Sequence, residues 1–162
     1  MGFPQASRVS RRLAANWRDE IAERWNVGLL EVGEEVGKDR LWCSRCAAGK
    51  SAGRGLPEEL YLSRQLRTFY RFVRRSGVRF GILSDLYGLH LDDERLEAYD
   101  VHPSSLTPER KVELGTIIGE KARVAGFERA VFYAISPVRS VPYFEMLCAS
   151  GLDVLYTTKI PR

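Results

Sequence analysis

Two cysteines and a lysine lie close together in the segment RLWCSRCAAGKS, residues 40–51, and different combinations of them suggest different chemistries. Cys43 and Cys46 have the spacing of a thiol redox centre or of half a zinc site, and Ala-Gly-Lys-Ser matches the end of a phosphate-binding loop. A redox pair needs its second cysteine in the first turn of a helix, but AAGKSAGRGLP follows Cys46 and is rich in glycine. A phosphate-binding loop needs a glycine where Ser44 stands, so we do not expect one.

A structural zinc site is also disfavoured, because zinc needs four ligands and this segment supplies two. The others would come from His90, His102 and Cys148, none of which belongs to a second paired motif. The sequence therefore predicts no metal site and no cofactor. A thiol redox centre and a plain buried thiol remain as alternatives to a reactive Cys43.

Length and composition indicate one folded domain. The chain has 162 residues, 44% of them apolar, and its net charge of +4 is smaller than expected for a protein that coats nucleic acid. No apolar run reaches the roughly 18 residues of a membrane span, the N-terminus lacks the apolar core of a signal peptide, and three cysteines do not suit a disulfide framework. We expect a cytoplasmic protein without membrane association, in which residues 1–162 form a single α/β domain and residues 1–30 an N-terminal helical extension.

Apolar periodicity and capping residues predict four helices. Residues 7–25 repeat apolar side chains four apart, and the segment TPERKVELGTIIGEKARVAG begins at Thr107 as N-cap and ends at Gly126. A short helix is expected before Gly151. The segment 58–76 follows Pro57, and its predicted buried stripe consists of Leu62, Leu66, Phe69 and Val73.

Four short apolar runs predict strands, at residues 40–44, 78–84, 130–135 and 153–156. Residues 85–105 are expected to form a polar loop or a short helical turn. Strands that alternate with helices favour an α/β three-layer sandwich with a mainly parallel sheet of about four or five strands. Ligands of such sheets bind beyond the carboxyl ends of the strands, which here read Cys43-Ser44, Ser84-Asp85 and Ser136-Pro137.

The order of several short motifs resembles a family of uncharacterised prokaryotic domains. CSRCAAGK, LPEELYLSRQLRTFYRF and FGILSDLYGLHLDDERLEAYD supply a strand ending in Cys-Ser, a Lys, a Leu-Tyr-x-Ser helix, a strand ending in Leu-Ser, a Tyr-Gly-Leu turn and a Tyr-Asp. The resemblance covers about residues 41–100. The Leu-Ser-x-Leu-Tyr-Gly part is also similar to the peroxide stress protein family YaaA, and Cys-Ser followed by Lys is more faintly similar to the archaeosine synthases.

The resemblance implies that the matched polar residues form one site. Cys43 would be a nucleophile beside Ser44, and Lys50 would hold a phosphate or carboxylate. Similarity to YaaA implies DNA binding, and similarity to archaeosine synthases implies a modified base in tRNA. Asp85 is either an added acid or a solvated turn residue, and the tyrosines could equally serve in packing. The substrate pocket would comprise Lys50, Ser63, Ser84, Asp85, Tyr87, Gly88, Tyr99 and Asp100.

Five arginines of segment 58–76 avoid the predicted buried stripe, and no acid stands among them: Arg64, Arg67, Arg71, Arg74 and Arg75. They are either phosphate contacts or a solubilising surface. The leading hypothesis is a nucleotide- or nucleic-acid-related enzyme with a Cys43/Ser44 pocket. The alternatives are a non-catalytic nucleic-acid-binding accessory domain and a thiol redox protein. The expected partners are DNA, RNA, tRNA or a nucleotide-like small molecule, and the sequence does not predict an oligomeric state.

Overall fold

A mainly parallel sheet forms the centre of the computed structural model, which describes residues 16–31, 34–47 and 52–160. The first five of its six strands run parallel and the last is antiparallel to its neighbour. In spatial order the strands are β1 (Gly28–Leu29), β8 (Asp153–Thr157), β7 (Arg129–Tyr133), β2 (Arg40–Arg45), β4 (Phe80–Ser84) and β5 (Gly88–Leu91). β3 (Arg54–Gly55) and β6 (Leu96–Glu97) form a separate antiparallel pair.

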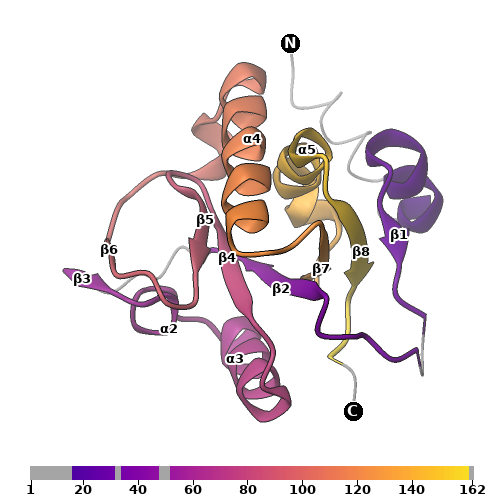
Figure 1. The fold of residues 1–162 in the computed structure, drawn as a ribbon. Coiled ribbons are helices and arrows are strands. Elements are labelled where there is room, and N and C mark those ends of the chain that lie inside the picture. The colour runs from indigo at the N-terminus through magenta and orange to yellow at the C-terminus, as the bar shows by residue number, and fades with distance from the viewer. Residues whose placement is uncertain (1–15, 32–33, 48–51, 161–162) are drawn as a thin grey trace.

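Helices cover both faces of this sheet (Figure 1), which confirms the predicted three-layer α/β architecture. α4 (Pro108–Val124) and α5 (Val141–Ser150) lie on one face, and α2 (Pro57–Leu60) and α3 (Arg64–Ser76) on the other. Residues 16–25 form a helix beside α5, where Trp25 stacks on Phe144; residues 7–15 of the predicted helix lie outside the described part. Two 3₁₀ turns, η1 (Pro103–Ser105) and η2 (Val138–Ser140), complete the fold. None of the helices in the described ranges has the length and apolar character that crossing a bilayer requires.

The four predicted strands are present in a mainly parallel sheet, which has six strands where about four or five were expected, but the expected loop at residues 85–105 was wrong. The sixth strand, β5, lies inside that loop and is buried along its whole length. It pairs with β4 through a tight turn in which the Ser84 hydroxyl accepts hydrogen bonds from the backbone N–H groups of Leu86 and Tyr87, at 3.2 and 2.9 Å. Gly88 closes this turn with a φ of 76°. The dense charges that follow β5 concealed this hairpin in the sequence.

The predicted single helix over residues 58–76 was wrong as well, because α2 and α3 are separate. The chain is extended at Tyr61, and Ser63 begins α3 by accepting a hydrogen bond from Leu66 N–H at 3.1 Å. This break buries Tyr61 and leaves Leu62 52% exposed, so Leu62 is not part of the buried stripe. The other three predicted members of the stripe, Leu66, Phe69 and Val73, are buried as expected.

α4 and α5 pack unusually closely, because two glycines of α4 face the backbone of α5. α4 begins at the predicted cap, where the Thr107 hydroxyl accepts from Arg110 N–H at 3.1 Å. A Cβ atom on Gly115 would lie 2.3 Å from the carbonyl oxygen of Met146, and one on Gly119 would lie 2.3 Å from that of Ser150. Only glycine fits at these two positions, and the contact fixes how α5 lies above the sheet.

Candidate functional site

The clearest candidate site is a cavity of about 140 Å³ at the carboxyl ends of β2 and β4. The two strands are parallel neighbours, with Arg45 beside Leu83, so their last residues meet at one edge of the sheet. This edge is where α/β proteins usually bind their ligands. The polar side chains that line the cavity belong to Arg45, Cys46, Asp85, Asp100, His102 and Tyr143.

Asp85 is the most confined charged group of this cavity, with 2% of its surface exposed. The Cys46 thiol donates to one carboxylate oxygen at 3.2 Å, and the Tyr143 hydroxyl donates to the other at 2.8 Å. Cys46 Sγ and Tyr143 Oη are themselves 3.4 Å apart. Three separate elements, the end of β2, the end of β4 and α5, therefore meet at one carboxylate. Donors on both oxygens fix the orientation of the carboxylate.

Cys46 acts in this cluster as a hydrogen-bond donor and not as a thiolate. Burial raises the pKa of its thiol, and the negative charge of Asp85 raises it further. Burial likewise raises the pKa of the Tyr143 hydroxyl. Both groups stay protonated near neutral pH, which is the state in which they can hold the Asp85 carboxylate in place.

Cys43 and Ser44 lie inside the sheet and not at its edge. β2 continues to Arg45, so Cys43 is placed between Gly81 and Phe132 in the neighbouring strands, and it is 1% exposed. Burial raises the pKa of the Cys43 thiol to about 12, which opposes formation of a nucleophilic thiolate. Ser44 is fully buried and donates to the backbone oxygen of Tyr133 at 2.8 Å. The geometry gives both residues structural positions and does not favour the predicted catalytic role.

Ser84, Tyr87 and Tyr99 are brought together, but in a hydrogen-bonded cluster next to the cavity and not on its lining. Ser84 donates to the Tyr99 hydroxyl at 2.6 Å, and Tyr87 donates to the backbone oxygen of Glu97 at 2.8 Å. The rings of Tyr87 and Tyr99 meet edge to face, with centroids 5.4 Å apart. These contacts tie the β4–β5 turn to the segment that carries Asp100, so the cluster positions part of the cavity rim.

The remaining predicted pocket residues are divided among different places. Asp100 is exposed and lines the cavity. Ser63 is the N-cap of α3, and the close backbone approach at Gly88 is to α4, since a Cβ there would lie 2.9 Å from Leu114 O. Lys50 lies outside the described residues.

Four polar residues of the cavity were not predicted as site residues from the sequence: Arg45, Cys46, His102 and Tyr143. Arg45 directly follows a predicted strand, which was a usable signal for an edge position. His102 and Tyr143 reach the cavity from distant segments, and only the topology brings them there.

Cys43 and Cys46 are both free thiols, and neither begins a helix. In the described ranges, no three His, Cys, Asp or Glu side chains are grouped as metal ligands would be.

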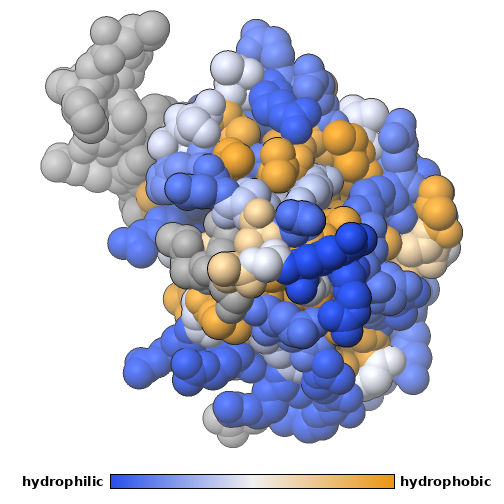
Figure 2. Space-filling view, turned by 90° about the vertical axis from the view of Figure 1, so that its left-hand side faces the viewer, coloured by the Kyte–Doolittle hydropathy of each residue, from blue (hydrophilic) through white to orange (hydrophobic). Residues whose placement is uncertain are grey.

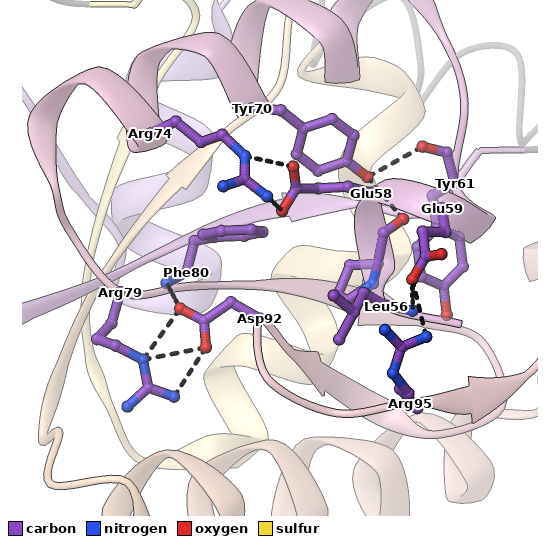
Figure 3. A network of polar contacts seen from close by, with 11 residues as sticks. Leu56, Glu58, Glu59, Tyr61, Tyr70, Arg74, Arg79, Phe80, Asp92 and Arg95 are labelled. Carbon is purple, nitrogen blue, oxygen red and sulfur yellow. Dashed lines mark hydrogen bonds and ion pairs between the residues drawn. The ribbon is translucent and has the colours of Figure 1, made fainter. Parts of the chain in front are cut away.

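The predicted arginine row on α3 is only partly available to a ligand. Arg74 forms a two-bond ion pair with Glu58, and Arg75 lies over the Phe72 ring at 5.9 Å (Figure 3 shows the first of these contacts). In one continuous helix, Glu58 and Arg74, 16 residues apart, would be about 24 Å apart, so this pair exists because α2 and α3 are separate. The other three arginines, Arg64, Arg67 and Arg71, are exposed and form no ion pair with any residue that the structure describes.

A second hollow, a groove of about 430 Å³, lies at the opposite edge of the sheet beside the start of β4. Its charged side chains are mostly paired with one another. Arg74 pairs with Glu58, and Arg79 pairs with Asp92 at 2.8 Å, on either side of Phe80 (Figure 3). The groove therefore offers a ligand fewer unsatisfied groups than the carboxyl-edge cavity does.

Comparison with known proteins gives no functional assignment, so the candidate function is argued from the geometry of the cavity. No protein-family model matches the sequence, and neither the curated proteins nor the solved structures give a significant match. The resemblances noted from the sequence motifs therefore remain predictions.

Proposed function

We propose that this protein is an enzyme that acts on a nucleotide-like substrate, free or within a nucleic acid, in the cavity at the carboxyl ends of β2 and β4. The observation that carries the proposal is the Asp85 carboxylate, which faces the cavity although it is 2% exposed. Burying a charged group is costly, and such groups concentrate at functional sites. Cys46 and Tyr143 hold this carboxylate from two sides.

The chemistry that this arrangement supports is proton transfer. Asp85 can accept a proton from a hydroxyl or amino group placed in the cavity, because the Cys46 thiol and the Tyr143 hydroxyl help to fix its position. Asp100 and His102 add polar groups at the rim. A cavity of about 140 Å³ is smaller than a typical pocket for a whole cofactor, so it suits one part of a nucleotide.

The test compares substrate turnover by Asp85→Asn with turnover by the natural sequence. The protein is incubated with nucleosides, nucleotides and tRNA, and products are detected by mass spectrometry. We expect Asp85→Asn to reduce turnover by about 100-fold or more, the range for loss of a general acid or base, while substrate binding is retained. Asn keeps the size of the side chain, and circular dichroism verifies that the variant folds.

Cys43→Ser is the matched control, because its side chain is buried away from the cavity and we expect turnover to be kept. Loss of turnover in Cys43→Ser with normal turnover in Asp85→Asn would place the reacting group at Cys43 and refute the role of Asp85. The same comparison with Cys46→Ser separates a positioning donor from a dithiol centre, which would lose activity equally in both cysteine variants.

A non-catalytic nucleic-acid-binding domain is the second candidate, and the row Arg64, Arg67 and Arg71 favours it. α3 lies in the lower part of the molecule in Figure 1, and the lower part of the surface in Figure 2 is predominantly hydrophilic. Cations at every three or four positions of an exposed helix match the regular negative charge of a phosphate backbone.

Fluorescence polarisation with labelled RNA and DNA oligonucleotides over a range of salt concentrations tests this candidate. Replacing the three arginines by Gln should flatten the slope of log K against log salt by about 2 to 3, because each phosphate contact contributes about 0.7 to 0.9. A control variant replaces three arginines that each pair with an acid, Arg95, Arg110 and Arg129. An equal effect in both variants would show that net charge alone is responsible.

A further inference from the structure

Arg45 is a cation of the cavity that has no anionic partner among the residues that the structure describes. It is the last residue of β2 and is partly buried, and its Nε–H is shielded from solvent without a hydrogen-bond partner in that part of the chain. No carboxylate in the described ranges lies within ion-pair distance of its guanidinium group. A buried donor without a protein partner is uncommon in folded proteins, and such donors usually bind a water molecule or an anion.

The neighbours of Arg45 do not satisfy it. The guanidinium lies close enough to Tyr156 for its charge to oppose the rise in the pKa that burial gives this hydroxyl. The Tyr156 hydroxyl, however, already donates to the backbone oxygen of Ala134 at 2.6 Å. Asp85, the buried acid of the same cavity, is held by Cys46 and Tyr143. The positive charge of Arg45 is therefore available to a ligand in the cavity.

We infer that Arg45 binds the phosphate group of the ligand, so that the substrate class is a phosphorylated nucleoside and not a free nucleoside or base. A guanidinium group presents its N–H donors as a planar fork that matches two phosphate oxygens. The carboxylates in the same cavity, Asp85 and Asp100, repel a phosphate and accept hydrogen bonds from hydroxyl or amino groups. The two kinds of charge thus assign the phosphate to Arg45 and the sugar or base to Asp85. This inference rests on the proposed function, because both use the same cavity.

The test measures binding of three probes by calorimetry: inorganic phosphate, nucleoside 5′-monophosphates and the corresponding nucleosides. The natural protein should bind the monophosphates at least about tenfold more tightly than the nucleosides, a difference of one charge-assisted contact or more. Arg45→Gln should remove this advantage, and Arg45→Lys should keep part of it, because lysine retains the charge but not the fork. Arg129→Gln is the control, since Arg129 is exposed at the start of β7, at the end of the strand opposite the cavity, and its replacement should leave the advantage unchanged.

The outcomes separate this inference from the proposed function. If nucleosides bind as tightly as monophosphates, or if the advantage survives in Arg45→Gln, the phosphate role of Arg45 is overturned while a nucleotide-binding cavity can stand. If inorganic phosphate binds in an Arg45-dependent manner but no nucleotide does, the anion site stands and the proposed function fails. If no probe binds, both fail. Should Arg45→Gln not fold, as judged by circular dichroism, Arg45→Lys decides the question: a reduced advantage supports the phosphate role of Arg45, and an unchanged advantage overturns it.

Discussion

Replacing Gly115 by Ala should destabilise the protein, although alanine is the better helix former. A Cβ atom at this position would lie 2.3 Å from Met146 O and 2.6 Å from Ala149 Cβ. The first distance is 1.1 Å short of the 3.4 Å at which ordinary contact begins. Because the obstructing atom belongs to the backbone of α5, no side-chain rotation relieves it, and α5 must move away from α4.

Two opposing effects set the size of the change. Gly-to-Ala replacement within a helix favours the folded state by about 1 kcal/mol. Overpacking of a close contact costs about 1–3 kcal/mol, and a backbone collision belongs at the upper end of that range. We therefore expect a net loss of about 2 kcal/mol in the free energy of unfolding. For a chain of this size, that corresponds to a melting temperature lower by roughly 4–8 °C.

Urea unfolding followed by circular dichroism measures this loss, and the double variant Gly115→Ala with Ala149→Gly is the control. Removing Ala149 Cβ relieves the side-chain collision but leaves the one with Met146 O, so stability should return only in part. Tyr143 lies one helical turn before Met146, and a shift of α5 would lengthen its 2.8 Å bond to Asp85. Unchanged or increased stability of Gly115→Ala would refute the close approach of α4 and α5.

Three further predictions follow from buried or constrained groups. Burial lowers the pKa of His90 in the folded protein, so as the pH falls the unfolded chain binds a proton at this histidine before the folded chain does. The free energy of unfolding should therefore decline as the pH falls below about 6.5. Urea unfolding at pH 7.5 and 5.5 measures this decline, and His90→Gln should reduce it. Ellman's reagent at pH 8 should react rapidly with Cys148 alone, and with the two buried cysteines only after unfolding; a second rapid thiol would contradict their burial. Gly88→Ala should cost more than about 1 kcal/mol in urea unfolding, because φ is positive and Leu114 O obstructs the Cβ, and more than Gly126→Ala, where nothing lies within 4 Å.

The central strands could be predicted because they are short apolar runs bounded by glycine, proline or charged residues. β4 and β7 are buried almost completely, as strands of a parallel sheet covered on both faces must be. The N-cap at Thr107 and the stop after α4 also follow from local residue preferences. The strands and helix ends depend mainly on residues close to them in the chain, so they can be predicted from a single sequence.

The break between α2 and α3 was hard to predict, because a helical apolar period competes there with the capping preference of a serine. Glu58 to Ser76 has a helical apolar period, yet Ser63 begins a new helix because its hydroxyl accepts from Leu66 N–H. The apolar side chain that enters the core is then Tyr61 and not Leu62. A shift of one position at a boundary thus exchanged a buried residue for an exposed one.

The sequence predicted the edge of the sheet that carries the candidate site, but it did not predict which residues meet there. Because β2 extends to Arg45, Cys43 lies two residues before the end of the strand and is paired with a strand on each side, so it is in the core and not at the expected edge. The partners of Asp85 are no more apparent from sequence, since Tyr143 is 58 residues away and meets it only through the α4–α5 packing. Residue types at strand ends therefore predict the edge of the sheet that carries a site, while the groups that meet there depend on the tertiary fold.

The arginine row begins at the same edge of the sheet as the cavity, because α3 runs antiparallel to the strands that it covers. Gln65, in its first turn, bonds to Ile135 N–H at 2.9 Å and to Ser44 at 3.3 Å, which places the start of α3 at the carboxyl edge of the sheet. Arg64 is therefore the member of the row nearest the edge that holds Arg45, and each later turn of α3 leads away from it. A polynucleotide bound along this row would run to the carboxyl edge of the sheet at Arg64, which is the edge that also carries the cavity, so nucleic-acid binding and a reaction in the cavity need not exclude each other.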